Sequence, residues 1–165
     1  MKIIGLDPGL RFTGWGVIEA YCGRECSYVK HGVISVPISL SLPERLKYIF
    51  FELKELINST DIDEVAVEEI FVNNNGKSTM KLCMARGVVV LVPKLCNKEI
   101  FEYTANKIKK TVVGYGHASK DEIKKMLKYT LLNFKEDKNE KSDGTDALAV
   151  ALCHAQHRQV LDLVS

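Results

Sequence analysis

The first 36 residues contain three strand-like segments and no helix-like segment, and this order restricts the fold more than any other feature of the chain. The segments are Lys2–Asp7, Thr13–Ala20 and Cys26–Val36, with turns at Pro8-Gly9 and Gly23-Arg24 between them. Consecutive strands joined by short turns pair in antiparallel order, because a parallel pair requires a long crossover. The sequence therefore predicts an antiparallel three-stranded meander.

The rest of the chain alternates between helix-like and strand-like segments. Asp61–Ile70 and Glu99–Tyr103 have the alternating or β-rich character of strands, which brings the predicted number of strands to five. This order predicts an α/β fold with one mixed five-stranded sheet and helices on both faces. The expected helices follow capping boxes at Ser41–Glu44 and Ser119–Glu122, or cover Ser78–Leu95, Ala105–Thr111 and a last segment from Asp143 onward.

Length and composition indicate one globular domain over residues 1–165, with residues 158–165 as a loose tail. The longest apolar stretch, Gly87–Val92, is far shorter than the roughly 20 residues of a membrane span. No export signal is recognised, so we expect a cytoplasmic protein. The surplus of apolar residues in the Ser78–Leu95 helix predicts a subunit interface.

The cysteines and the net charge are less informative. Five cysteines without a CxxC pair indicate reduced thiols, and a zinc site from Cys22, Cys26 and His31 lacks a fourth ligand at a familiar spacing. The net charge of +2 does not by itself indicate a nucleic-acid partner. Lysine clusters lie at 106–110, 120–128 and 135–141, where they either follow a phosphate backbone or form solvated helix faces.

Four acids are the candidate chemical residues. Asp7 ends the first strand before Pro8-Gly9, and alternation in the fourth strand places Glu68 on the opposite face from Glu69. Asp143 and Asp146 share one face at the start of the last helix. The alternative roles are structural: Asp7 starts a turn, and Asp143 and Asp146 cap a helix.

If these acids converge, their mutual repulsion must be neutralised by a cation. Oxygen ligands with room for water select Mg²⁺ or Mn²⁺ over zinc. A pair of such ions activates a water and stabilises the leaving oxygen of a phosphodiester. The cluster therefore predicts hydrolytic phosphoryl transfer.

Several separated motifs resemble those of the bacterial RuvC family of Holliday junction resolvases, in the family's order over about residues 1–157. The resemblance implies an RNase H-like fold of the retroviral-integrase type. The motifs are Gly5-Leu6-Asp7-Pro8-Gly9, Thr13-Gly14-Trp15-Gly16, Ala66-Val67-Glu68-Glu69-Ile70-Phe71, Lys81-Leu82 with Ala85-Arg86-Gly87, Val112-Val113-Gly114 and Asp143-Gly144-Thr145-Asp146-Ala147-Leu148-Ala149.

The resemblance also implies residue roles. The metal-binding catalytic acids are Asp7, Glu68, Asp143 and Asp146, which hold Mg²⁺ or its substitute Mn²⁺, with two ions per subunit. Phe71 matches an aromatic placed against DNA bases, although it could instead be a core residue at a strand end. Phosphate contacts are implied for Lys109 and Lys120, whereas Arg86 could instead form a structural ion pair.

Two segments depart from the family pattern. Gly144 and Thr145 stand where many relatives have alanines, which weakens helix propensity but keeps the spacing of the acids. The loop at Asn73–Asn75 is less basic than similar loops, which predicts a weaker grip on DNA there.

The expected function is a Mg²⁺-dependent endonuclease that resolves four-way DNA junctions in recombination and repair by two symmetric nicks. A two-fold symmetric substrate calls for a homodimer, and the resemblance raises the family's branch-migration motor complex as a further partner. Two alternatives stay open: a nuclease of the same fold that acts on RNA or ribosomal RNA precursors, and a non-catalytic junction-binding module.

Overall fold

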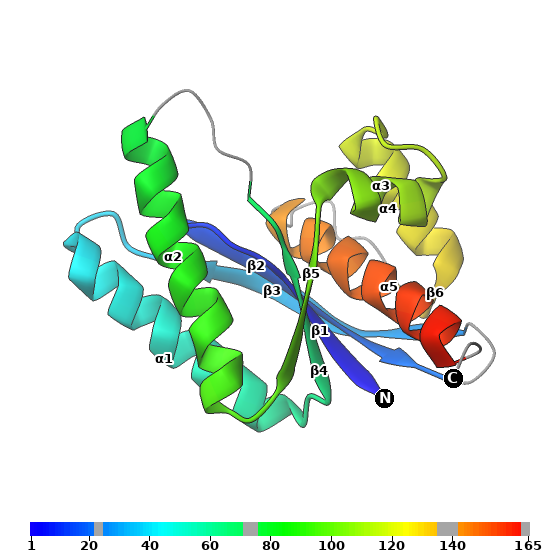
Figure 1. Cartoon of the computed structure of the whole chain (residues 1–165), viewed down its shortest axis with the longest axis horizontal. Helices are drawn as coiled ribbons and strands as arrows, with labels where there is room; N and C mark the ends of the chain where they lie inside the picture. The colour runs from blue at the N-terminus through cyan, green and yellow to red at the C-terminus, as the bar shows by residue number, and fades with distance from the viewer. Residues whose placement is uncertain (22–24, 71–75, 135–141, 163–165) are drawn as a thin grey trace.

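In the part of the chain that the structure describes, the sheet contains six strands in the order β5-β4-β1-β2-β3-β6. The computed structural model describes residues 1–21, 25–70, 76–134 and 142–162 (Figure 1). The predicted meander is confirmed, since β1 pairs antiparallel with β2 and β2 with β3, whereas the other three pairs are parallel. The strands are β1 (Lys2–Asp7), β2 (Phe12–Ala20), β3 (Cys26–Ser35), β4 (Glu64–Glu68), β5 (Glu99–Tyr103) and β6 (Leu131–Leu132).

The predicted mixed sheet is confirmed, but the predicted number of five strands is wrong. Leu131 and Leu132 form an additional two-residue strand, which pairs with Cys26 and Ser27 at the edge of β3. This pairing satisfies backbone groups at the sheet edge and buries Leu131 to 2% exposure. The fourth strand is shorter than predicted: it ends at Glu68, and it starts at Glu64 because Asp61 is the left-handed C-cap of the preceding helix.

Helices cover both faces of the sheet, as predicted (Figure 1). The helices α1 (Leu42–Thr60) and α2 (Gly76–Leu95) lie on one face, and α3 (Ala105–Val113), α4 (Lys120–Thr130) and α5 (Ser142–Asp162) lie on the other. Both predicted capping boxes are present, at Ser41 and at Ser119. The α5 helix continues to Asp162.

Strand alternation divides the apolar residues between two cores. Ile4, Leu6 and Val65 pack toward α1 and α2, whereas Ile3 and Ala66 pack toward α5. Successive side chains of a strand point to opposite faces, so each central strand contributes to both cores. The face that carries Ile3 and Ala66 is the face that also carries Asp7 and Glu68.

Three glycines allow α5 to pack directly against the backbone of β1 and β2. A Cβ atom added at Gly5 would lie 2.0 Å from the carbonyl oxygen of Ala147, and one at Gly16 would lie 2.7 Å from the backbone nitrogen of Leu148. At Gly14 the added atom would lie 2.1 Å from the carbonyl oxygen of Asp143. Any larger residue would therefore push α5 away from the sheet.

The described residues also bear on the expected thiols, the zinc site and the membrane spans. Cys26, Cys83, Cys96 and Cys153 are free thiols, as expected. His31 Nδ1 lies 3.0 Å from the Tyr28 hydroxyl oxygen, and no zinc-binding group that includes it occurs in the described ranges. Every helix described is too short or too polar to span a membrane. Cys22 and the lysine cluster at 135–141 lie outside the described residues.

Candidate active site

Asp7 and Glu68 lie at the same edge of the sheet because β1 and β4 are parallel neighbours. The backbone register pairs Gly5 with Ala66 and Leu6 with Val67, which places Asp7 and Glu68 at corresponding strand ends. Alternation from Gly5 and Ala66 turns both acids toward α5, as the sequence predicts. Both carboxylates line a pocket at this edge.

The first turns of α5 bring two further acids to the end of β1. Asp7 is paired in register with Gly14 of β2, and the backbone of Asp143 packs against Gly14. One turn later, Asp146 lines the same pocket as Asp7 and Glu68. Asp143 is not among the lining residues, but it lies close enough to raise the pKa of Asp7.

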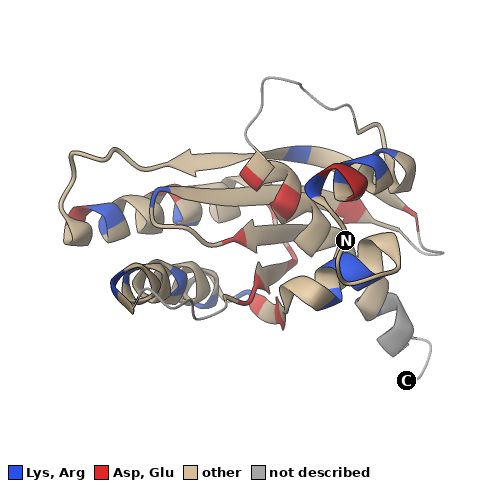
Figure 2. Cartoon of the chain, turned by 90° about the horizontal axis from the view of Figure 1, so that it is seen from above, with Lys and Arg blue, Asp and Glu red and all other residues tan. Residues whose placement is uncertain are grey.

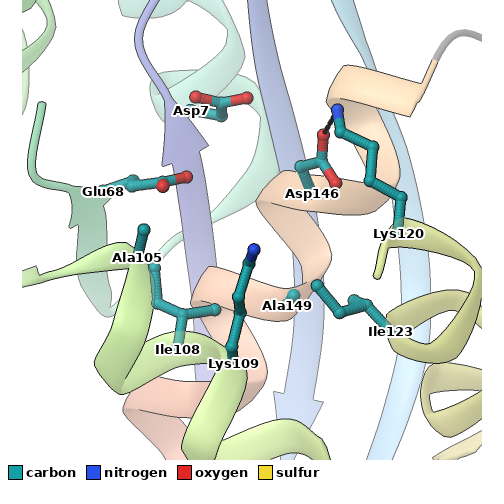
Figure 3. Close-up of a pocket in the computed structure, with 9 residues that line it drawn as sticks. All are labelled: Asp7, Glu68, Ala105, Ile108, Lys109, Lys120, Ile123, Asp146 and Ala149. Carbon is teal, nitrogen blue, oxygen red and sulfur yellow. Dashed lines mark hydrogen bonds and ion pairs between the residues drawn. The ribbon is translucent and has the colours of Figure 1, made fainter. Parts of the chain in front are cut away.

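The pocket has a volume of about 280 Å³ and lies between the ends of β1 and β4 and the helices α3, α4 and α5. Figure 3 shows the side chains of Glu68 and Lys109 pointing into the space beside α5, with Asp7 at the tip of β1 and Asp146 across from it. Apolar residues line the pocket beside these charged groups. These apolar lining residues are Ala105 and Ile108 of α3, Ile123 of α4 and Ala149 of α5.

Burial and mutual repulsion perturb the acids. Burial is the largest cause that raises the pKa of Asp7, and together with the nearby charges of Glu68, Asp146 and Asp143 it brings this pKa to about 7. Burial and the charge of Asp146 also raise the pKa of Glu68. Carboxylates with raised pKa values at one rim bind protons or cations more readily than isolated surface acids.

Lys120 partly offsets this negative charge. Its ammonium nitrogen lies 2.6 Å from Asp146 Oδ2 and 3.4 Å from the Ser142 hydroxyl oxygen. The hydrogen bond to Asp146 raises the pKa of Lys120, which keeps the ammonium group charged. Lys109 lies on the opposite wall, and its charge lowers the pKa of Glu68.

The four acids form a donor set that suits a hard divalent cation, since all four offer carboxylate oxygens and three of them share one pocket. In the described ranges, however, no group of three His, Cys, Asp or Glu side chains is gathered tightly enough to hold an ion. Asp146 is instead hydrogen-bonded to Lys120. A bound cation would therefore compete with the Lys120 ammonium group for Asp146.

The structure brings together most of the residues singled out in the sequence. Asp7, Glu68, Asp146, Lys109 and Lys120 line one pocket, with Asp143 at its edge, and their catalytic and DNA-binding roles stay predictions.

Other residues noted in the sequence fall elsewhere. Phe71 and the Asn73–Asn75 loop lie outside the described residues. Arg86 forms an ion pair with Glu102 of β5, which confirms the structural alternative for this residue.

The substitution at Gly144 has a local explanation. A Cβ atom added there would lie 2.7 Å from His31 Cδ2 and 3.2 Å from the Gly32 carbonyl oxygen. Glycine has a low helix propensity, but an alanine at this position would be too close to β3.

Sequence reasoning did not assign the roles of Gly14 and Gly16. Their spacing of two along β2 placed them on one strand face, and this alternation was the available signal.

The mixed sheet and the acid-lined edge define a protein of the RNase H-like fold. The family model described as "Crossover junction endodeoxyribonuclease RuvC" matches residues 3–154. The curated protein of that name from Bartonella tribocorum is 43% identical over 98% of this chain and 92% of its own length. That from Alkaliphilus oremlandii is 46% identical over 94% of this chain and 93% of its own.

Solved structures agree with this assignment. Thermus thermophilus RuvC in complex with a Holliday junction substrate superimposes with a TM-score of 0.88 at 28% identity, covering 97% of this chain and 96% of that chain. The yeast mitochondrial Holliday junction resolvase Ydc2 has a TM-score of 0.70 at 9% identity, covering 96% and 83%, and shows the shared fold alone. The chain belongs to the RuvC family of crossover junction endodeoxyribonucleases.

The pKa of Asp7 predicts a pH-dependent effect of Asp7→Asn on stability. The folded chain holds the Asp7 proton up to about pH 7, whereas the ordinary pKa is 3.8, so folding stability falls as pH rises between these values. Asparagine cannot ionise. Asp7→Asn should therefore raise the melting temperature by on the order of 5 °C at about pH 8 in the presence of a chelator, and change it little at about pH 4.

Asp61→Asn is the matched control, because Asp61 is exposed at the end of α1 and asparagine tolerates the same left-handed conformation. Its melting temperature should stay close to that of the wild type at both pH values. If Asp7→Asn is equally destabilised at both pH values, the negative charge of Asp7 does not lower the stability of the folded chain, and the prediction is wrong.

Proposed function

We propose that the chain resolves four-way DNA junctions in recombination and repair by cutting two opposing strands. The pocket carries this proposal, because acids from β1, β4 and α5 meet there in a chain of the RuvC family. A family structure superimposes while bound to a Holliday junction substrate, which supports the choice of DNA substrate. The alternatives of an RNA substrate or a non-catalytic role have no observation of their own.

The proposed cofactor is Mg²⁺, with Mn²⁺ as a substitute and two ions per subunit. Asp7, Glu68, Asp143 and Asp146 would hold the ions, because their carboxylate oxygens suit hard cations, and burial together with neighbouring negative charge raises the pKa values of Asp7 and Glu68. Bound ions would supply a water nucleophile at neutral pH and stabilise the charge that develops on the phosphate.

The remaining pocket residues bind and orient the DNA strand in this proposal. Lys109 and Lys120 stand on opposite walls and carry positive charge toward the space that a phosphate would occupy. The apolar floor formed by Ile108, Ile123 and Ala149 limits water beneath the acids and strengthens electrostatic interactions there. Phe71 remains the predicted base-stacking residue, on the resemblance alone.

The overall charge distribution fits a local rather than a global DNA-binding surface. Seen from above, basic residues lie on several helices and acidic residues are interspersed with them (Figure 2). With a net charge of +2, long-range attraction to DNA is weak. Recognition in this proposal therefore depends on cations at the pocket and on the shape of the junction.

Cleavage of a synthetic four-way junction tests the proposed reaction. The purified chain with Mg²⁺ should give paired, symmetric nicks, and Asp7→Asn should bind the junction but cut it at least about a hundredfold more slowly, because one ion-binding carboxylate is lost. Gel assays of binding and of cleavage measure the two steps separately. Asp61→Asn should cut like the wild type.

Three outcomes would contradict the proposal. Full-rate cleavage by Asp7→Asn would remove Asp7 from the mechanism. Equal cutting of linear duplex or RNA would favour the RNA-directed alternative. Metal-independent binding of the junction without cleavage in Mg²⁺ or Mn²⁺ would favour the non-catalytic module.

The Lys120–Asp146 ion pair predicts an effect on metal affinity. Removing the ammonium group frees Asp146 Oδ2, so Lys120→Met should bind Mn²⁺ about fivefold more tightly, on the 1 kcal/mol scale of a partly exposed ion pair. Mn²⁺ titration followed by thermal shift measures this without any cleavage. Junction cleavage should fall in the same variant because a phosphate contact is lost.

Lys109→Met is the matched control, since Lys109 lines the pocket without a hydrogen bond to Asp146. Its Mn²⁺ affinity should rise less than that of Lys120→Met. Equal changes in the two variants would show that only the general positive charge of the pocket matters, and a weaker affinity in Lys120→Met would contradict the competition.

The proposed active form is a homodimer that associates through α2. The outer side of this helix exposes apolar residues at helical spacing, whereas its buried side packs against the sheet and α1. Two-fold association would match the two-fold symmetry of two opposing nicks. The exposed apolar residues are Met80, Met84, Leu91 and Leu95, with exposures of 61%, 40%, 52% and 56%.

Leu91→Glu tests this interface. A charge in the centre of an apolar contact is costly, so the variant should be monomeric in sedimentation or light scattering at concentrations where the wild type is a dimer. Tyr129→Glu, at an 86% exposed position on α4, should stay dimeric. A dimeric Leu91→Glu protein would place the interface elsewhere.

A cytoplasmic location and association with a branch-migration motor complex complete the proposal. The four free thiols in the described part of the chain suit a reducing compartment. The motor complex is proposed on the family resemblance alone.

A further inference from the structure

A chain of polar side chains is buried between α5 and the sheet, below the pocket. His154 is 1% exposed, and its two ring nitrogens bond in opposite directions. Nδ1 lies 2.7 Å from the Tyr103 hydroxyl oxygen, and Nε2 lies 2.7 Å from Glu64 Oε2. Arg158 Nε lies 3.1 Å from the other oxygen of the same carboxylate. Four side chains from α5, β4 and β5 are thereby connected.

The protonation states of this network are mutually consistent. Burial lowers the pKa of His154 and raises the pKa of Tyr103 to about 12, so the ring is neutral and the phenol keeps its proton. The Tyr103 hydroxyl therefore donates to His154 Nδ1, and Nε2–H donates to Glu64. Each of these buried polar groups has a partner, which makes the hydrogen-bond directions specific.

The two ends of the network lie at different distances from the acids. Glu64 begins β4, at the end of the strand away from the pocket, whereas Tyr103 ends β5 and is paired in register with Glu68. The backbone N–H of Glu69 donates to the Tyr103 carbonyl oxygen over 2.9 Å. Tyr103 therefore belongs to the backbone that supports Glu68.

Tyr103 also connects to the wall formed by α3. The next residue, Thr104, is the N-cap of α3, and this helix carries Ala105, Ile108 and Lys109 of the pocket. The Lys107 ammonium nitrogen lies 5.0 Å from the centre of the Tyr103 ring. The hydrogen bond from Tyr103 to His154 thus joins the β5–α3 junction to the helix that carries Asp146.

The packing of α5 against the sheet explains why directional hydrogen bonds matter for the position of this helix. Where α5 crosses β1, its contact with the sheet is built from small residues, with Ala147 and Ala151 against Gly5. Such contacts allow close approach but interlock less than long side chains do, and apolar contact is non-directional. Hydrogen bonds at His154 fix the helix against sliding and rotation, and His154 lies about 12 Å along the helix from Asp146.

We propose that Tyr103 and His154 are positioning residues that set the distance between Asp146 on α5 and the Glu68–Lys109 side of the pocket. The inference rests on the proposed junction-cutting function and assigns these two residues to the support of that site. They touch neither substrate nor ion. Their effect reaches the reaction through the placement of the acids, where small displacements cost much of the rate.

Tyr103→Phe tests the proposal because it removes one hydroxyl group and keeps the ring that contacts Lys107 and His157. With the junction substrate and Mg²⁺, kcat should fall about tenfold while KM and junction affinity stay within about twofold. The Mn²⁺ concentration for half-saturation, measured by isothermal titration calorimetry without DNA, should rise about three- to tenfold. A change confined to stability would move neither value at temperatures well below unfolding.

Glu64→Gln is the matched control, since it weakens the same network at the end away from the pocket and leaves the Tyr103–His154 bond in place. Its kcat and Mn²⁺ half-saturation should stay within about twofold of the wild type, even if its melting temperature falls as far as that of Tyr103→Phe.

Two results would overturn the inference: wild-type kcat and Mn²⁺ affinity in Tyr103→Phe, or equal losses in both variants. A wild-type chain that cuts no junction would overturn the proposed function instead. In that case the Mn²⁺ affinities of the three proteins still decide whether Tyr103 positions the acids.

Discussion

The close contact between α5 and the central strands is the constraint on which the rest of the structure depends. Gly5, Gly14 and Gly16 leave no side chain between β1, β2 and the helix backbone. The start of α5 therefore reaches the end of β1, where Asp7 lies. Without this approach, Asp143 and Asp146 would stand away from Asp7 and Glu68, and the acid-lined pocket would not form.

The same approach creates an electrostatic cost that the fold does not fully offset. Burial and neighbouring carboxylates raise the pKa of Asp7, and Lys120 lowers it only as the smallest contribution. Apolar residues beneath the acids limit hydration further. Such a destabilised arrangement is typical of functional sites, where stability is exchanged for cation or substrate binding. Lys120 then acts as an internal counterion that a stronger cation could displace.

Local sequence signals predicted much of the architecture. Short turns gave the meander, both capping boxes marked real helix starts, and alternation correctly turned Glu68 toward the α5 side. The strand at Leu131–Leu132 was missed because two residues carry no periodicity. Only edge pairing with β3 defines it.

The candidate site was predicted less completely than the fold. The acids were found from strand ends and helical spacing, but their convergence needed the resemblance, because it depends on how α5 docks. The ion pair between Lys120 and Asp146 joins two helices and has no local pattern. His154 lies among apolar residues of α5, and no local pattern indicates its partners on β4 and β5, which are distant in sequence.

In β1 and β4, a residue that packs in the core is directly followed by an acid that faces the pocket. Leu6 and Val67 fill the core beneath α1 and α2, the side that would support association, whereas their neighbours Asp7 and Glu68 face the pocket. One residue inserted or deleted before Asp7 would reverse this assignment, sending the carboxylate into an apolar core and a leucine toward the acids. The length of these central strands is therefore under stricter constraint than most of their side chains, and variation among functional sequences should come by replacement there and by insertion only in the connecting loops.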